Sequence, residues 1–291
     1  MKYLRILFNI ILLVVIIFFT EGCDKSSKEN ISRLKTITIQ SEVLGKDIKS
    51  KVYLPKEYNN DEKYPVLYFL HDGGGTADTV IFQYDIINKI DLLEAKNKTQ
   101  PMIIVALGIE QSFGINSSQE NTRIRTQSGK SFYQGMYEDY IITEAIPFID
   151  SHFNTNSNKD GRFIGGYSMG GFAALYIAFT HTDMFSRVGG HSPSLFVTDF
   201  PDKYVTEWLY PNEQLRKERD PINIAQDKNL ATLTIYLDTG ETDVNVEGCK
   251  KLYDILQEKG VKSEYHLFPG THSRAYCNNY MYNYLLFYGA E

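Results

Sequence analysis

The feature that most constrains the fold of this chain is an alternation between short apolar runs and longer segments of helical periodicity. The apolar runs have the length of buried strands and lie at 66–70, 102–107, 162–167, 187–191, 233–237 and 264–268. Segments with helical periodicity lie at 79–95, 137–153, 169–179, 244–258 and 274–288. Because parallel strands are joined through crossover helices, this alternation predicts a mostly parallel central sheet with helices on both faces.

The pattern differs near its beginning, where polar and apolar residues alternate at 34–43 and 48–54 on either side of a turn at Gly45. We expect an N-terminal antiparallel hairpin there. The length of the chain suits one large α/β domain at 34–291 better than two small ones. Within that domain, Pro147 is expected to kink the helix at 137–153.

Two stretches fit neither the strand pattern nor the helix pattern. Residues 108–134 are polar and follow directly on a strand, which places them at the carboxyl edge of the sheet. A loop of this length in a compact domain is usually functional or disordered. Residues 192–226 also leave the end of a strand and contain Trp208 and several prolines. We expect this second stretch to form a cap over the same edge.

The first residues have the pattern of an export signal. Lys2 and Arg5 precede an apolar run at 6–19 that is too short to span a membrane comfortably. The step from Gly22 to Cys23 is typical of a bacterial lipoprotein cleavage site. We expect 1–22 to be the signal, 23–33 a polar tether, and Cys23 the lipidated N-terminus of an exported, membrane-anchored protein. The alternatives are secretion after another cleavage and an uncleaved anchor helix.

Charge and cysteine content exclude several other classes of protein. The formal net charge of −6 argues against a nucleic-acid partner, and a lipid anchor is the only expected contact with a membrane. Besides Cys23 the sequence contains only Cys249 and Cys277, so it has neither a disulfide framework nor zinc-ligand spacing. We expect both to be buried free thiols, and a single disulfide is the alternative.

A nucleophile motif follows the strand predicted at 162–167. Gly166, Ser168 and Gly170 form a G-x-S-x-G elbow, and a helix rich in small residues follows it. Such a turn holds the serine in a strained backbone conformation, which requires glycines where side chains would collide. Ser168 is therefore the predicted nucleophile. The N–H of Met169, at the start of the helix, is a predicted donor to the oxyanion formed in acyl transfer.

A serine nucleophile needs a base and an acid, which in this kind of fold follow it in the order acid, then histidine. Asp243 follows the strand at 233–237, and His272 follows the strand at 264–268. His272 is predicted to accept the proton of Ser168 and to return it to the leaving alcohol. Asp243 is predicted to fix the tautomer of His272 and to stabilise the imidazolium.

Alternative assignments exist for both groups. Asp243 directly precedes a helical segment and could be only its N-cap, in which case Asp238 is the main alternative acid and Glu241 the next. His191 stands at a strand end and is expected to line the pocket without taking part in the chemistry. Three further histidines are expected to have no catalytic role. His152 and His181 stand at helix ends and are expected to be solvated, and His266 lies within a strand and is expected to be structural.

A second oxyanion donor is expected in the loop after the first parallel strand. His71 and Asp72 stand there, followed by Gly73, Gly74 and Gly75. Glycines let backbone N–H groups approach an acyl oxygen without a side chain in the way. Gly73 is the candidate donor, with Gly74 almost equal to it. A flexible turn before the next helix is the structural alternative.

These residues together resemble the putative-esterase family of α/β-hydrolases, which groups esterase D, feruloyl and acetylxylan esterases, siderophore esterases and mycolyltransferases. The resemblance covers about residues 35–288 and rests on Tyr68-Phe69-Leu70-His71 with the glycines after it, 144–150, 165–171, Asp183-Met184-Phe185 and 268–272. It implies an α/β-hydrolase fold with Ser168, Asp243 and His272 as nucleophile, acid and base. The chain departs from the family pattern at Asp72, where a glycine is usual, and across 192–226.

The expected function is that of a serine carboxylic ester hydrolase, whose catalytic domain works through an acyl-enzyme without a metal or an organic cofactor. The resemblance and the export signal favour an ester on a glycan, such as a feruloyl or acetyl ester. A siderophore (trilactone) esterase and an acyltransferase are alternative enzymes. A non-catalytic glycan-binding surface protein is the alternative from another class, and the intact serine, acid and histidine argue against it.

Overall fold

The computed structural model describes residues 33–125, 129 and 131–290. The chain divides into a unit at 1–35 and a unit at 36–291, and the second contains the fold described below. The expected export signal, Cys23 and nearly all of the expected tether lie outside the described residues. Within the described part of the chain, no helix has both the length and the apolar character needed to cross a membrane.

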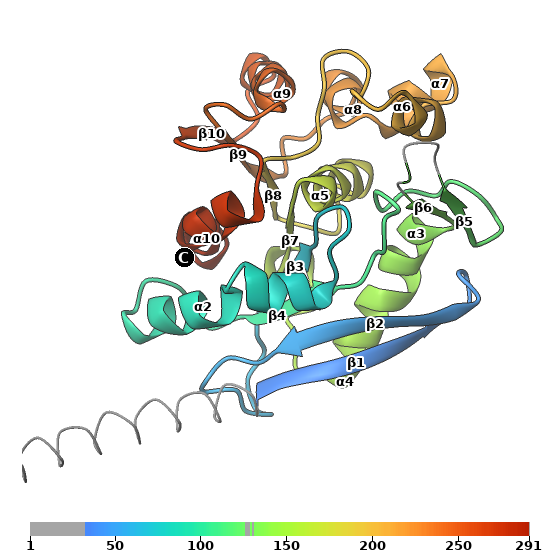
Figure 1. The fold of residues 1–291 in the computed structure, drawn as a ribbon. Coiled ribbons are helices and arrows are strands. Elements are labelled where there is room, and N and C mark those ends of the chain that lie inside the picture. The colour runs from blue at the N-terminus through green and yellow to red at the C-terminus, as the bar shows by residue number, and fades with distance from the viewer. Residues whose placement is uncertain (1–32, 126–128, 130, 291) are drawn as a thin grey trace, which may run out of the picture. The chain divides into compact units, whose positions relative to one another are not determined.

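The core of the domain is an eight-stranded sheet with the strand order β1-β2-β4-β3-β7-β8-β9-β10 (Figure 1). The six strands from β4 to the β10 edge of the sheet are parallel to one another, whereas β2 runs antiparallel to β4. The expected parallel sheet with an N-terminal hairpin is therefore confirmed. The strands are β1 (Leu34–Ser41), β2 (Lys46–Tyr53), β3 (Val66–Leu70), β4 (Ile103–Leu107), β7 (Arg162–Tyr167), β8 (Arg187–His191), β9 (Thr234–Gly240) and β10 (Ser263–Phe268).

Helices cover both faces of this sheet. Helices α2 (Ile86–Ala95) and α10 (Arg274–Gly289) pack together on one face, and α5 (Met169–Thr180) lies on the other (Figure 1). Successive residues of β8 point to opposite faces. A Cβ atom built on Gly189 would meet Tyr288 of α10, and one built on Gly190 would meet Leu175 of α5. Every residue of α5 from Met169 to Phe179 is buried, as expected for a helix that is apolar on all sides.

Two predicted helices are interrupted. The segment at 79–95 forms a π-helical turn, η1 (Thr79–Gln83), and then α2, because Asp85 between them adopts a left-handed conformation with φ 57°. The segment at 137–153 contains α3 (Tyr137–Asp139), the π-helical η2 (Tyr140–Ala145) and α4 (Ile146–His152). Pro147 lies in the first turn of α4, where its missing N–H is tolerated and the hydrogen-bond pattern changes from π to α.

The two stretches that fitted no pattern have structure of their own. The long segment after β4 contains a small antiparallel hairpin, β5 (Thr122–Arg125) and β6 (Ser131–Gln134). The expected cap contains three short helices, α6 (Lys203–Leu209), α7 (Glu213–Arg219) and α8 (Pro221–Asp227). Trp208 of α6 packs on Phe113 and Phe132, with ring centroids 5.8 and 5.1 Å apart. The two segments therefore form one continuous wall beside the carboxyl edge of the sheet.

Candidate active site

Ser168 occupies the sharp turn between β7 and α5. Its backbone has φ 58° and ψ −118°, which a residue with a side chain rarely adopts. A Cβ atom on Gly166 would lie 2.5 Å from the Gly170 carbonyl oxygen, and one on Gly170 would lie 2.2 Å from the Leu70 carbonyl oxygen. Both glycines are therefore needed for the turn to pack against the end of β3. The turn places Ser168 at the N-terminus of α5, where it lines a pocket.

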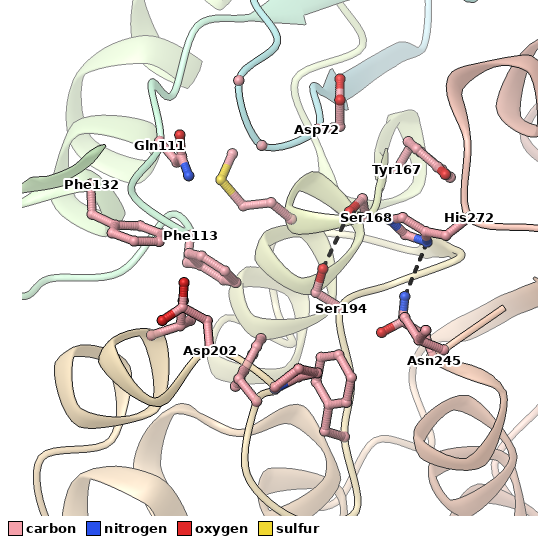
Figure 2. Close-up of a pocket in the computed structure, with 18 of the residues that line it drawn as sticks. Asp72, Gln111, Phe113, Phe132, Tyr167, Ser168, Ser194, Asp202, Asn245 and His272 are labelled. Carbon is pink, nitrogen blue, oxygen red and sulfur yellow. Dashed lines mark hydrogen bonds between the residues drawn. The ribbon is translucent and has the colours of Figure 1, made fainter. Parts of the chain in front are cut away.

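His272 and Asp243 lie next to Ser168 in one connected row of hydrogen bonds. The Oγ of Ser168 is 2.7 Å from the Nε2 of His272, and the Nδ1 of His272 is 2.9 Å from the Oδ2 of Asp243. The Asp243 side chain is fully buried, whereas the His272 side chain is 30% exposed at the pocket. The structure thus brings together the three residues predicted as nucleophile, base and acid (Figure 2 labels the serine and the histidine).

The carboxylate of Asp243 has three hydrogen-bond donors. His272 Nδ1 and Ser192 Oγ both donate to Oδ2, and the backbone N–H of Asn245 donates to Oδ1 at 2.9 Å. Burial alone would raise the pKa of Asp243, but these donors outweigh it and hold the pKa below its ordinary value. Helix α9 (Val246–Glu258) begins after Asn245, so Asp243 is not its N-cap.

The two alternative acids lie elsewhere. Asp238 is fully buried in β9 and accepts hydrogen bonds from His191 Nδ1 at 3.0 Å, Tyr276 at 2.6 Å and Tyr284 at 2.9 Å. Its carboxylate is occupied in this internal network, which holds α10 against β8 and β9. Glu241 is exposed on the turn that follows β9. Among the three candidate acids, only Asp243 has a hydrogen bond to His272 in the described structure.

His191 does not line the pocket, contrary to the expectation from its position at a strand end. It is fully buried, donates from Nδ1 to Asp238 and accepts at Nε2 from the hydroxyl of Tyr288 at 2.9 Å. Burial lowers the pKa of His191, so the ring is neutral. Room for Tyr288 comes from Gly165 and Gly189, where a Cβ atom would lie 1.9 and 2.0 Å from the tyrosine oxygen. His191 is therefore a packing residue beneath the site.

The predicted oxyanion loop follows β3 and borders the same pocket as Ser168. Gly73 and Gly74 line it together with Met169. Asp72 fixes the loop, because its carboxylate accepts from the Tyr84 hydroxyl at 2.6 Å and from Arg274 Nε at 2.8 Å. Arg274 is two residues from His272. The carboxylate of Asp72 therefore ties the glycine loop after β3 to the segment that carries His272.

His71 holds the other side of this loop. Its Nε2 accepts from the backbone N–H of Ile109 at 3.3 Å, and its Nδ1 donates to the carbonyl oxygen of Asp72 at 2.9 Å. Burial lowers the pKa of His71, which keeps the ring neutral and lets Nε2 act as an acceptor. The ends of β3 and β4 are thereby joined at the edge of the site.

The pocket in front of Ser168 has a volume of about 680 Å³. One wall is aromatic and comes from the two segments that pack together, with Phe113 and Phe132 from the long loop and Phe196 and Phe200 from the cap. Gln111 and Asp202 are among its polar residues (Figure 2). Both stretches that were expected near the carboxyl edge therefore contribute to the pocket.

Three polar residues of the site were not predicted from the sequence. Ser192 donates to Asp243 and has a left-handed backbone with φ 45°. Ser194 places its Oγ 3.3 Å from the Oγ of Ser168, and Asn245 places Nδ2 3.1 Å from His272 Nδ1 (Figure 2). The available signal was position, because the two serines directly follow β8 and the asparagine lies in the turn after β9.

The two remaining cysteines lie away from this chemistry. Cys249 of α9 and Cys277 of α10 are buried free thiols, as expected from the sequence. Burial raises the pKa of each thiol well above its ordinary value, so neither is a reactive thiolate at neutral pH.

Comparison with known proteins places this geometry in a family. The family model described as putative esterase matches residues 41–288. The chain is 28% identical over 248 residues to an endo-1,4-beta-xylanase/feruloyl esterase of Xylanibacter ruminicola, which covers 83% of this chain and 29% of that protein. It is 31% identical over 174 residues to esterase Rv1288 of Mycobacterium tuberculosis, which covers 59% of this chain and 35% of that protein. The matches span about a third of the length of these relatives.

A solved structure shows the same fold. A ferulic acid esterase superposes with a TM-score of 0.72 at 23% identity, over 88% of this chain and 97% of that chain. At this identity the likeness establishes the α/β-hydrolase fold and not the substrate. The family model, by contrast, matches well over half of the chain. The protein is therefore a member of the putative-esterase family of α/β-hydrolases.

Proposed function

We propose that this esterase is a serine hydrolase that forms an acyl-enzyme on Ser168. The observation that carries the proposal is the continuous row from Ser168 Oγ through both nitrogens of His272 to the buried carboxylate of Asp243, with separations of 2.7 and 2.9 Å. The strained elbow at the N-terminus of α5 supports it, because this turn presents the hydroxyl where a backbone N–H can meet the developing oxyanion.

In the acylation half-reaction, Ser168 Oγ attacks the carbonyl carbon of the ester while its proton moves to His272 Nε2. The carbonyl oxygen takes the negative charge and faces the N–H groups of Met169 and Gly73. When this intermediate collapses, the bond to the alcohol oxygen breaks, and the proton on Nε2 moves to that oxygen. Asp243 stays ionised throughout and keeps the other proton of the ring on Nδ1.

Deacylation repeats these steps with water. His272 Nε2 accepts a proton as the water oxygen attacks the acyl carbon, and the oxyanion again faces the two N–H groups. Collapse breaks the bond to Ser168 Oγ, which recovers its proton from Nε2. The products are a carboxylic acid and the free enzyme, so the cycle needs no group beyond the residues named and water.

The proposed substrate is an ester of a glycan with an aromatic acyl group of the feruloyl type. The support is the wall of four phenylalanines within a pocket of about 680 Å³, because rings of an acyl group pack well between aromatic side chains. The relative from Xylanibacter ruminicola carries the name feruloyl esterase. An acetyl group would leave most of this wall without contact. A trilactone esterase and an acyltransferase are the alternatives that the substrate test must separate.

We also propose that the chain is exported and lipidated at Cys23. The support is the sequence before it, with two basic residues, the apolar run at 6–19 and the glycine that precedes the cysteine. Globomycin, which blocks the lipoprotein signal peptidase, is expected to leave unprocessed precursor in producing cells. Normal maturation in its presence would contradict lipidation and would favour secretion or an uncleaved anchor.

The substrate proposal is tested with a panel of esters and a matched inactive variant. Wild type and Ser168→Ala are compared on a feruloylated arabinoxylan oligosaccharide, an acetylated xylan oligosaccharide and a cyclic catecholate trilactone. The expected result is the highest kcat/KM for the feruloyl ester, with no turnover by the variant. A preference for the acetyl ester or the trilactone would overturn the aromatic assignment. An ester product formed with an added alcohol, in preference to the free acid, would indicate an acyltransferase.

A further inference from the structure

Asn245 has an unexplained position beside the proposed base. Its side-chain amide lies at the pocket, and Nδ2 is 3.1 Å from His272 Nδ1 (Figure 2). The residue is only 1% exposed, and its side-chain oxygen Oδ1 is buried without a hydrogen-bond partner among the described residues. A buried carbonyl oxygen without a donor is costly, so this arrangement needs a reason.

The location of the ring proton constrains which amide atom faces the histidine. Nδ1 of His272 lies 2.9 Å from Oδ2 of Asp243, and an ionised carboxylate can only accept a hydrogen bond. Nδ1 therefore carries the proton, and Nε2 is left free to accept from Ser168. An amide NH₂ group facing the same Nδ1–H would place two donors against each other at 3.1 Å.

We infer that Asn245 turns its side-chain carbonyl oxygen toward His272 Nδ1–H and is a second acceptor for the base, beside Asp243. The oxygen and nitrogen of an amide have almost the same shape, and the surrounding hydrogen bonds determine which occupies each position. A half turn of the amide removes the donor–donor contact and gives the carbonyl oxygen a partner, while the NH₂ group moves to the position that the oxygen held. Asn245 is then a positioning residue of the active site. This inference rests on the proposed function.

A second acceptor has a consequence for the chemistry. When Nε2 takes the proton of Ser168, the ring becomes a cation, and both the carboxylate of Asp243 and the dipole of the Asn245 carbonyl face its Nδ1–H. The ring is also held from one side by Tyr167, whose ring centroid is 5.1 Å away. The acceptor pair fixes the tautomer and the tilt of the ring, and so keeps Nε2 aimed at the nucleophile.

A purely structural role for the Asn245 side chain finds no support in its contacts. It stands at the N-cap position of α9, but its side chain makes no capping hydrogen bond. Its backbone N–H, which donates to Asp243 Oδ1, is present whatever the side chain. Replacing the side chain therefore removes no helix cap, and the effect on the base can be measured separately from the effect on the fold.

The test compares Asn245→Leu with Asn245→Asp. The leucine variant has a similar size and no acceptor, and its kcat is expected to fall about tenfold with little change in KM, because one hydrogen bond to a charged group is lost. The aspartate variant keeps an oxygen in place and should recover most of the lost kcat near neutral pH. Its second carboxylate favours the protonated ring, so the acidic limb of its kcat/KM profile should move to higher pH.

Apart from residue 245, the charged and titratable groups around the His272 ring are the same in the wild type and in both variants. Asp243 and Tyr167 contact His272, and the ion pair of Arg274 with Asp72 lies beside it. All of them are unchanged in both variants. Asn223→Leu removes a half-buried amide from α8, outside the site, and is the matched control that should keep wild-type kinetics.

Each outcome decides one question. Wild-type kcat in Asn245→Leu, or an aspartate variant that is as slow as the leucine variant with an unmoved acidic limb, would overturn the inference while wild-type activity upholds the proposed function. No activity in folded wild type would overturn the proposed function itself. If Asn245→Leu does not fold, the acidic limb of Asn245→Asp decides alone, since a limb identical to that of wild type contradicts a side-chain oxygen of residue 245 facing His272 Nδ1–H.

Discussion

The Oγ of Ser168 and the Nε2 of His272 lie 2.7 Å apart although the residues are separated by 104 positions in the chain. The serine follows β7 and the histidine follows β10, and two further strands, β8 and β9, lie between them in the sheet. All four strands are parallel, so their carboxyl ends meet at one edge. The loops after β8 and β9 bring Ser192 and Asp243 to the same edge. The site is therefore a direct product of the strand order.

Asp243→Asn is expected to lower kcat about a thousandfold with little change in KM. The amide is nearly isosteric, but it no longer holds the proton on Nδ1 by charge, and the ring populates tautomers that cannot accept from Ser168. Kinetics on p-nitrophenyl acetate and circular dichroism of the purified variant provide the measurement. A folded variant with near wild-type kcat would show that another group orients His272.

Asp238→Asn is expected to affect stability and to spare the chemistry. Three donors point at this fully buried carboxylate, and an amide would turn an NH₂ toward one of them. We expect the free energy of unfolding to fall by about 2–4 kcal/mol, measured by urea denaturation at neutral pH. The kcat per folded molecule should stay within about tenfold of wild type. A loss of kcat as large as that of Asp243→Asn, without loss of stability, would contradict a structural role.

Gly165→Ala is expected to destabilise the fold through Tyr288. The added methyl group would lie 1.9 Å from the tyrosine oxygen, and overpacking of this kind costs about 1–3 kcal/mol or more. Tyr288→Phe removes that oxygen, so the cost of Gly165→Ala should be smaller in its background. A double-mutant cycle of unfolding free energies measures this coupling. Additive effects of the two substitutions would show that the contact does not limit stability.

Asp220→Asn is expected to stabilise the protein in a pH-dependent way. Burial raises the pKa of Asp220 to about 6, so the folded state binds its proton more tightly than the unfolded state, whose carboxyl has an ordinary pKa. Wild type therefore loses stability as the pH rises from about 4 to about 6. The asparagine keeps a carbonyl oxygen for the N–H of Ile222, which caps α8.

The measurement for Asp220 is the difference in unfolding free energy between the variant and wild type across pH. It should be near zero at pH 4, grow up to pH 6 and then stay constant at about 1–3 kcal/mol in favour of the variant. A difference that does not depend on pH would mean that the carboxyl titrates alike in the folded and unfolded states.

The parts of the site that could be predicted from the sequence are those that local motifs specify. The elbow around Ser168 is specified by five consecutive residues, and the position of His272 follows from the strand that precedes it. The parallel sheet could be predicted for the same reason, since each strand is a short apolar run. The break at Asp85 could not, because nothing in the neighbouring residues requires its left-handed backbone.

The contacts that complete the site depend on tertiary structure. Ser192 reaches Asp243 because β8 and β9 are neighbours in the sheet, and Asn245 reaches His272 because β9 and β10 are neighbours. Spacing in the chain does not reveal these neighbours. The three helices of the cap could have been predicted from their N-cap residues. Each begins after a residue whose side chain accepts a backbone N–H at the helix start, namely Asp202, Asn212 and Asp220.

The central claim is that Ser168 is a nucleophile activated by His272, and covalent labelling tests it most directly. The purified protein is treated with a fluorophosphonate, and the modified residue is located by peptide mass spectrometry, beside Ser168→Ala and His272→Ala. We predict one adduct per chain on Ser168 in wild type, none in Ser168→Ala and much slower labelling in His272→Ala. Folded wild type that hydrolyses esters without acquiring a label on Ser168, or that is labelled at another residue, would contradict the account.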